Sequence, residues 1–454
     1  MGPPDLLPQL RTEVPGLRSR QLAARLQRVE CADTTFVDDT FPLFWERASG
    51  CNVWDADGNR FVDLTAAFGV CILGHTHVVQ RTAVLRQAGR LVHAMGDVHP
   101  AALKVELAEQ LARLAPAALE VVLFGSSGSD AIEAALKTAS LATGRPGAVA
   151  FEGAYHGLGY GALSLTWRAH FRGPFRAQLN PHVVHLPYPG RRHGAASSGD
   201  GAPVAVHQIL ERLDTLLGSD AGEAIGAVFV EPIQGRGGVV VPAADFLPGL
   251  REICTRRGRL LVADEILTGL GRTGSWFACS QADVVPDLLC LGKSLAGGLP
   301  LSACIGTKAV MQCWERSRGE ARHTQTFLGN PLAAAVASAT LHLLEKEDWP
   351  ARVAERGAVL GEELAALLSG REGVVAIRGR GFLWGIECGG PHGADGARVR
   401  EVVHAALRRG WILLPAGDEG EVLELLPPYV LGAAQWRGML EVLDELMSRI
   451  PASV

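Results

Sequence analysis

The segment Leu260–Leu301 constrains the fold more than any other part of the chain. It contains two short apolar runs, Leu260–Ala263 and Leu288–Leu291, and turn-forming residues follow each of them. Short apolar runs bounded by turns are typical of buried strands. The first run leads into Asp264, and the second is followed closely by Lys293. If the two strands are parallel neighbours, both side chains lie at one sheet edge, where α/β proteins bind ligands.

The rest of the chain predicts an α/β protein. Strand-like and helix-like segments alternate from residue 119 to residue 305, which favours a mainly parallel sheet. Helices are predicted over 206–217 and 246–257, and a surface loop over 188–203. We expect residues 71–335 to form a large cofactor-binding domain. Residues 1–70 would be the N-terminal segment of a smaller α+β domain that 336–454 complete.

Composition excludes several classes of partner. The 454 residues carry a net charge of −5, which gives no electrostatic case for nucleic acid or an anionic membrane. No apolar span reaches the roughly 20 residues of a membrane helix. The nine cysteines are scattered, without metal-site spacing, and His75 and His77 have no recognisable set of further ligands. We expect a cytoplasmic protein with reduced thiols and no metal.

One glycine pattern points to a dinucleotide site but lacks its context. Residues 269–274, GLGRTG, match the GxGxxG fingerprint and follow a predicted strand. The fingerprint also needs a helix that starts within the motif. The following residues, SWFACSQADVVPDLL, are typical of a loop. We therefore interpret GLGRTG as structural, although it leaves a nicotinamide dehydrogenase as a remote alternative.

Pyridoxal 5′-phosphate accounts for more of the residues. This cofactor needs an amine for its aldehyde, an acid for its ring nitrogen, a phosphate cradle and a flat contact for its ring. Lys293 and Asp264 meet the first two needs. A small-residue turn opens the helix that follows the predicted strand 119–124, and helix N-termini favour anions. The remaining candidates are Ser127, Gly128 and Ser129 for the phosphate and Tyr155 for the ring.

Six motifs, in order, resemble those of class III pyridoxal-phosphate aminotransferases. They are GSSGSDAIEAALK, FEGAYHG, VEPIQGRGG, LLVADEILTGLGRTG, LGKSLAGGLP and TFLGNPLAAA. The resemblance covers about residue 41 to the C-terminus and implies fold type I, a homodimer with shared active sites and a Schiff base on Lys293. It also implies further cofactor contacts. These are the ring partner Asp264, the stacking Tyr155, the phosphate ligands Gly128 and Ser129, a phosphate ligand lent by the neighbouring subunit at Thr326, the supporting acid Glu231 and the apolar contact Ile266.

The sequence departs from these relatives at four positions. Leu267 replaces a glutamine that reaches the cofactor's ring hydroxyl in many relatives. In the γ-aminobutyrate subgroup a glutamate and an arginine pair across the substrate wall, but here Arg236 and Glu424 occupy these positions in exchanged order. Leu158 replaces a further arginine. We therefore hypothesise that the donor is an amine, an ω-amino acid or an apolar amino acid. Arg236 would contact a carboxylate, unless Arg236 and Glu424 form a purely structural pair.

The expected reaction is a ping-pong transfer of an amino group from this donor to an oxo acid. Lys293 would act as general base and acid, while Asp264 holds the charge of the ring. A racemase or epimerase of amino acids or amino lactams with the same fold is the main alternative, and a non-enzymatic regulator that binds the cofactor is a weaker one. The natural donor, the acceptor and the stereochemical preference stay open.

Overall fold

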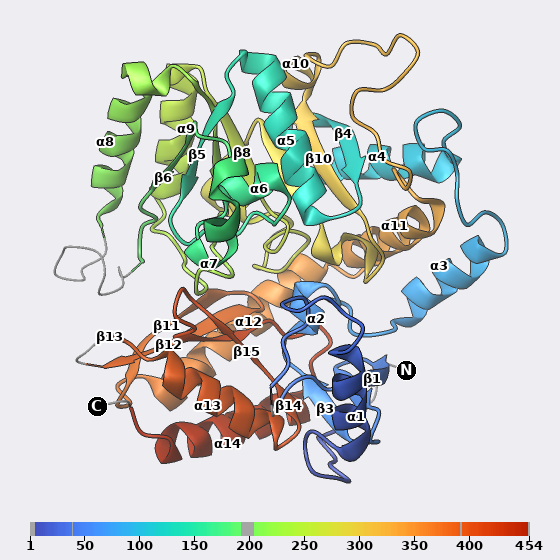
Figure 1. Ribbon diagram of the computed structural model, residues 1–454, viewed down its shortest axis with the longest axis vertical. Coiled ribbons are helices and arrows are strands. Elements are labelled where there is room, and N and C mark those ends of the chain that lie inside the picture. Colours follow the sequence, from blue (N-terminus) through green and yellow to red (C-terminus); the bar gives the residue numbers. More distant parts are fainter. Residues whose placement is uncertain (1–4, 39, 192–203, 391–392, 453–454) are drawn as a thin grey trace. The chain divides into compact units, whose positions relative to one another are not determined.

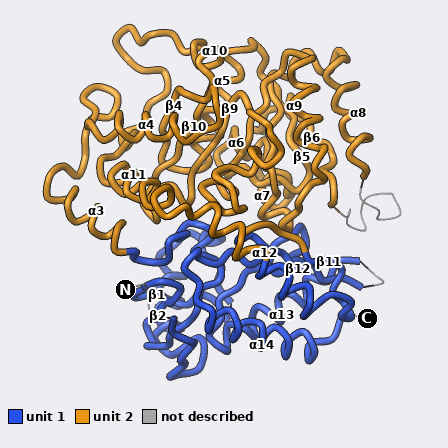
Figure 2. Tube along the Cα trace, turned by 180° about the vertical axis from the view of Figure 1, so that it is seen from behind, with its two compact units in different colours: residues 1–77, 359–377, 382–454 blue, residues 78–358, 378–381 orange. Residues whose placement is uncertain are grey.

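The computed structural model describes residues 5–38, 40–191, 204–390 and 393–452. Residues 192–203 of the loop predicted over 188–203 lie outside these ranges. The chain forms two compact units, coloured separately in Figure 2. One unit comprises residues 1–77, 359–377 and 382–454, and the other comprises residues 78–358 and 378–381. Helix α12 (Trp349–Leu368) runs from the second unit into the first.

The second unit is built on a seven-stranded sheet in the order β4-β10-β9-β8-β7-β5-β6. Neighbouring strands from β9 to β6 are parallel, whereas β10 is antiparallel to both β9 and β4. The mainly parallel α/β fold predicted from the sequence is therefore confirmed. The strands are β4 (Leu119–Gly125), β5 (Gly147–Phe151), β6 (Val183–Leu186), β7 (Ile225–Val230), β8 (Leu260–Asp264), β9 (Leu288–Leu291) and β10 (Ser302–Thr307).

Helices cover both faces of this sheet, as Figure 1 shows. Val228 of β7 packs in one cluster with residues of α8 (Val206–Leu217) and α9 (Phe246–Arg257), the two helices predicted with these bounds. Phe229 belongs to a second cluster with residues of α5 (Gly128–Thr143). Because side chains alternate across a strand, a sheet with two apolar faces needs continuous apolar runs such as IGAVFV in β7.

The other helices of this unit connect or flank the strands. They are α3 (Val78–Ala88), α4 (Ala102–Leu114), α6 (Tyr160–Leu165), α7 (Ala169–Arg172), α10 (Lys308–Met311) and α11 (Pro331–Lys346). Short 3-10 turns interrupt the loops at Gly173–Gln178, Asp220–Gly222, Ala278–Ala282 and Lys293–Ala296.

The first unit contains two smaller sheets. The order β1-β2-β3-β14 brings the N-terminal strands β1 (Trp45–Ser49), β2 (Asn52–Asp55) and β3 (Arg60–Asp63) beside β14 (Trp411–Ile412). Strands β2 and β3 form an antiparallel hairpin. The other sheet has the order β11-β12-β16-β15, with β13 beside β12. Its strands are β11 (Val374–Arg380), β12 (Leu383–Gly390), β13 (Gly393–Ala394), β15 (Leu414–Ala416) and β16 (Val422–Leu425).

The described part of the first unit contains four further helices. They are α1 (Leu17–Leu26), α2 (Ala66–Gly69), α13 (Gly396–Leu407) and α14 (Ala433–Arg449). The short segment α2 departs from helical geometry, because Ala67 and Phe68 have left-handed backbone angles. Since L-residues pay a steric cost there, this segment needs support from its surroundings.

Candidate active site

Four neighbouring parallel strands end at one edge of the large sheet and carry the predicted polar residues there. Asp264 is the last residue of β8, Glu231 follows β7, Tyr155 lies on the loop after β5, and Lys293 lies two residues beyond β9. The strands β9, β8, β7 and β5 are consecutive in the sheet. The structure thus brings these four side chains to one edge, where ligands bind in α/β sheets.

Asp264 is a buried carboxylate with two fixed partners. One oxygen, Oδ1, accepts the backbone N–H of Ile266 at 3.0 Å, and Oδ2 lies 2.7 Å from Nδ1 of His156. The side chain of His156 is fully buried, and that of Asp264 is 4% exposed. His156 was not among the residues predicted from the sequence. The available signal was its position directly after Tyr155 on a loop that follows a buried strand.

The surroundings of His156 favour its protonated form. Burial by itself would lower the pKa of His156, but the hydrogen bond to Asp264 and the negative charges of Asp264 and Glu231 raise it. The backbone N–H of His156 donates to the hydroxyl of Thr166 at 3.0 Å, and this hydroxyl donates to the carbonyl of Gly157 at 2.9 Å. These bonds fix the loop that carries His156.

Glu231 joins two loops at the same edge. Its Oε1 accepts the backbone N–H of Tyr155 at 2.9 Å, and its Oε2 accepts the N–H of Gly235 at 3.1 Å. Burial raises the pKa of Glu231, while the nearby imidazole of His156 opposes this shift. The carboxyl group therefore supports the backbone behind Tyr155 rather than projecting into solvent.

Tyr155 and Arg236 are electrostatic neighbours. The Tyr155 ring is half-buried and packs edge-on against Phe171, with ring centroids 5.7 Å apart. Burial raises the pKa of the Tyr155 hydroxyl, and the positive charge of Arg236 acts in the opposite direction. Leu158 lies on the same loop as Tyr155 and is 49% exposed.

The start of α5 forms a cradle of backbone N–H groups. Ser127 is the N-cap: its hydroxyl accepts the N–H of Asp130, and the Asp130 carboxylate accepts the N–H groups of Ser126 and Ser127 at 3.0 Å. Among the described residues, the backbone N–H groups of Gly128 and Ser129 find no protein acceptor. Open N–H groups at a helix N-terminus fit a phosphate. The Ser127 hydroxyl is used for capping.

Close packing joins this cradle to the neighbouring loops. A Cβ atom added to Gly128 would lie 3.1 Å from Cδ1 of Ile266, and one added to Gly292 would lie 3.4 Å from Cα of Gly128. The hydroxyl of Ser129 accepts the N–H of Gly159 at 3.0 Å, which places the Tyr155 loop against the same helix end.

Lys293 follows Gly292 in a strained backbone conformation. Its φ angle is +31°, and it begins the 3-10 turn Lys293–Ala296. A left-handed φ costs an L-residue roughly 1–2 kcal/mol, and such strain gathers at functional sites. Leu267 is buried beside the same edge, since a Cβ atom on Gly235 would lie 2.1 Å from its Cδ2.

Two predicted residues come from segments other than these strand ends. Thr326 is exposed in the turn before α11, next to Gln325, whose side chain accepts the hydroxyl of Ser126 at 2.9 Å. Glu424 is buried in β16, opposite Gly385 and Leu414. It belongs to the first unit, whereas Arg236 belongs to the second.

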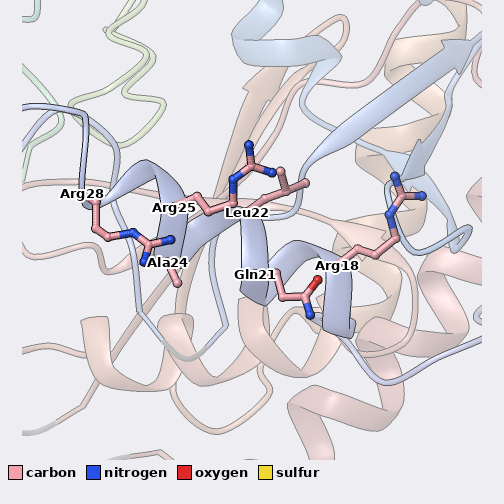
Figure 3. A pocket seen from close by; sticks show the side chains of 6 residues that line it. All are labelled: Arg18, Gln21, Leu22, Ala24, Arg25 and Arg28. Carbon is pink, nitrogen blue, oxygen red and sulfur yellow. The ribbon is translucent and has the colours of Figure 1, made fainter.

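The other motifs and surfaces provide fewer groups that could bind a ligand or take part in a reaction. No helix begins within GLGRTG, which forms turns. Within the described ranges, no three His, Cys, Asp or Glu side chains could hold a metal ion. In the same part of the chain, no helix is long and apolar enough to span a membrane. A surface hollow of about 400 Å³ along α1 has three arginines and no carboxylate or lysine in its lining (Figure 3). The residues that line it are Arg18, Gln21, Leu22, Ala24, Arg25 and Arg28.

Comparison with known proteins identifies the family of the chain. Residues 35–447 match the sequence model of the aminotransferase class-III family. An acetylornithine aminotransferase of Methanopyrus kandleri is 36% identical over 89% of this chain and 95% of its own length. An alanine/serine racemase of Pyrococcus horikoshii is 32% identical over 96% and 92%.

A solved structure gives the same result for the fold. An amine transaminase from an uncultivated Pseudomonas species, in its PLP-bound internal aldimine form, superimposes with a TM-score of 0.84. The match covers 93% of this chain and 99% of that one, at 28% identity. Together with the family match, this confirms fold type I. The chain belongs to the class-III aminotransferase family and is accordingly a pyridoxal-phosphate-dependent aminotransferase.

Proposed function

We propose that the protein transfers an amino group from an amine, an ω-amino acid or an apolar amino acid to an oxo acid. The main support is the grouping of three features at one edge of the large sheet. They are the buried Asp264 carboxylate, Lys293 and the open N–H groups at the start of α5. These groups match the ring nitrogen, the aldehyde and the phosphate of pyridoxal 5′-phosphate.

Each group has a distinct role in this proposal. The bound cofactor would supply an aldehyde that takes up amines and a ring that withdraws electrons. Asp264 would hold a proton on the ring nitrogen, and Gly128 and Ser129 would bind the phosphate. Tyr155 would lie against the ring, and Ile266 would pack beside it.

Lys293 would move the proton on which the reaction depends. Its amino group would be available to accept the proton of the donor carbon and to return it as an acid. The strained turn at Gly292-Lys293 fixes the backbone from which the Lys293 side chain extends, close to Ile266 and Gly128. A side chain that starts from a fixed position needs less reorientation to reach the reacting atom.

The substrate side of the proposal rests on Leu158 and Arg236. Leu158 offers an exposed apolar surface on the loop of Tyr155, and Arg236 supplies a positive charge close to the Tyr155 ring. An apolar donor, or one with a distant carboxylate, suits this combination. Glu424 is proposed either to limit the access of substrates or to offset the positive charge of Arg236.

The lysine provides the central test. Lys293→Ala should abolish turnover of a panel of amine, ω-amino acid and apolar amino acid donors with oxo-acid acceptors. It should also remove the visible absorbance of covalently bound cofactor. Lys346→Ala, at the end of α11, is the matched control and should behave like the wild type. Retained turnover and absorbance in Lys293→Ala would contradict the proposal.

A racemase is the second candidate, because the relatives include the alanine/serine racemase of Pyrococcus horikoshii. A racemase uses the same lysine but needs no oxo-acid acceptor. Transfer of ¹⁵N from a labelled donor to an added oxo acid would support the aminotransferase. Loss of optical activity of one amino acid without an acceptor would support the racemase instead.

We propose a homodimer in which Thr326 reaches the partner's phosphate site. Six apolar side chains of the adjoining segments are each at least 42% exposed, namely Leu85, Leu91, Val92, Met95, Val98 and Phe327. Phe327 contacts His93, with ring centroids 5.5 Å apart, so the two segments form one surface. Exposed apolar patches of this kind mark protein interfaces, and a second copy is the occupant proposed.

The dimer can be tested by placing charges on this surface. Val98→Asp combined with Phe327→Asp should convert dimers to monomers in light scattering and reduce turnover. Val359→Asp, on the exposed face of α12, is the control and should stay dimeric. A dimer that survives the double substitution would refute the interface.

We also propose a cytoplasmic location. Six of the nine cysteines are buried, and no two of the described cysteines form a disulfide. This pattern suits a reducing compartment. Fractionation of the native host, with the protein detected by antibody, would test the location, and recovery outside the cytoplasm would refute it.

A further inference from the structure

The buried pair of His156 and Asp264 carries an inference beyond the proposed roles of the predicted residues. A buried ionised carboxylate is costly unless it is paired and hydrogen-bonded. Asp264 meets this condition through two partners that hold its two oxygens separately, the N–H of Ile266 at 3.0 Å and Nδ1 of His156 at 2.7 Å. The plane of the carboxylate is thereby fixed.

The direction of the His156 bond follows from the chemistry of its partner. An ionised carboxylate can only accept hydrogen bonds, so Nδ1 of His156 must carry the hydrogen. The other ring nitrogen, Nε2, is buried without a hydrogen-bond partner among the described residues. The interaction with Asp264 is therefore the hydrogen bond that orients the imidazole ring.

The backbone of His156 is anchored as firmly as its side chain. Its N–H donates to Thr166, and the preceding N–H, of Tyr155, donates to Glu231. The same short loop thus carries both rings: that of Tyr155, which is proposed to lie against the cofactor, and that of His156, which is bonded to Asp264. A shift of this loop would move both.

We infer that His156 is a positioning residue: its Nδ1–H bond fixes the orientation and the negative charge of Asp264, so that Asp264 can hold a proton on the cofactor's ring nitrogen. This inference rests on the proposed function. Removing a hydrogen-bond partner of this kind from a metal ligand costs on the order of 10- to 100-fold in affinity. We expect a loss of similar size for pyridoxal 5′-phosphate.

The experiment titrates pyridoxal 5′-phosphate into the cofactor-free protein and follows intrinsic fluorescence. His156→Leu should weaken binding by about 10- to 100-fold. His156→Asn retains an N–H donor near the position of Nδ1 and should stay within a few-fold of the wild type. His185→Leu is the matched control. His185 is a buried histidine of the same unit, bonded to the carbonyl of Leu165, and its loss should leave binding nearly unchanged.

A second measurement separates positioning from a general structural role. The pH at which the visible absorbance of the bound cofactor changes should shift in His156→Leu and return toward the wild-type value in His156→Asn. If His156→Leu does not fold, His156→Asn is compared with His156→Gln, whose amide reaches the position of Nε2 instead. The asparagine variant should then bind the cofactor more tightly.

The outcomes are distinct. A wild-type protein that binds no pyridoxal 5′-phosphate would refute the proposed function itself. Normal binding by the wild type with unchanged affinity and pH profile in His156→Leu would overturn only the role of His156. Equal losses in His156→Leu and His185→Leu, or equal affinities of the asparagine and glutamine variants, would also overturn it.

Discussion

The buried pair of His75 and Asp63 predicts a specific dependence of stability on pH. Nε2 of His75 lies 2.8 Å from the fully buried Asp63 carboxylate. Asp63 also accepts the N–H and hydroxyl of Thr65 and the N–H of Ala67. These bonds support the left-handed segment α2, where φ is 48° at Ala67 and 63° at Phe68. Substituting His75 should therefore destabilise this segment.

The size of the effect follows from the pKa of His75. Burial alone would lower this pKa, but the hydrogen bond to Asp63, with contributions from Cys71, raises it from 6.5 to about 10. At about 1.4 kcal/mol per pKa unit, the shift corresponds to roughly 5 kcal/mol. Measured losses for breaking a buried ion pair are about 3–5 kcal/mol. We expect about 3–5 kcal/mol at pH 6.

The direction of the pH dependence follows from the linkage between proton binding and folding. Because the folded protein holds the proton of His75 more tightly, this stabilisation is complete below pH 6.5 and is lost as pH rises toward 10. Between these values it falls by about 1.4 kcal/mol per pH unit. In His75→Gln the titrating group is absent, while the glutamine amide can still donate to Asp63.

The assay is equilibrium urea unfolding of wild type and His75→Gln at pH 7, 8 and 9 and constant ionic strength. The difference in unfolding free energy should shrink by about 3 kcal/mol from pH 7 to pH 9. His207→Gln, on the exposed side of α8, corrects for the loss of a histidine as such. A difference between wild type and His75→Gln that is constant with pH would refute this reasoning.

Four further substitutions, one of them a control, test the strain and the site. Ala67→Gly should raise the free energy of unfolding by roughly 1 kcal/mol, because glycine has no Cβ to strain at a left-handed φ, whereas Ala366→Gly on the exposed face of α12 should cost about 1 kcal/mol. Arg236→Ala should raise KM for carboxylate donors about tenfold and leave simple amines unaffected, and an unchanged KM would exclude that contact. Gly128→Ala should weaken pyridoxal 5′-phosphate binding to the cofactor-free protein by about tenfold, since its Cβ would lie 3.1 Å from Ile266 and force repacking; tight binding would show that the cradle adapts.

Much of the fold could be predicted because local patterns report directly on it. The continuous apolar runs of β7, β8 and β9 predicted buried strands, and the helical spacing over 206–217 and 246–257 predicted α8 and α9. The antiparallel orientation of β10 was not visible, because an apolar run looks the same whichever way its strand points.

The placement of Asp264 and Lys293 at one sheet edge could be predicted from the sequence, because each lies at or shortly after the end of a strand-like run. The partners of the buried acids could not. His156 and Asp264 are separated by 108 residues, and His75 meets Asp63 across a left-handed segment that no periodicity indicates. Periodicity tells which face a side chain occupies, but only the packing of strands and loops decides which buried groups meet. A buried charge is stable only when it is paired. The contacts His156–Asp264 and His75–Asp63 therefore influence the pKa values of these groups.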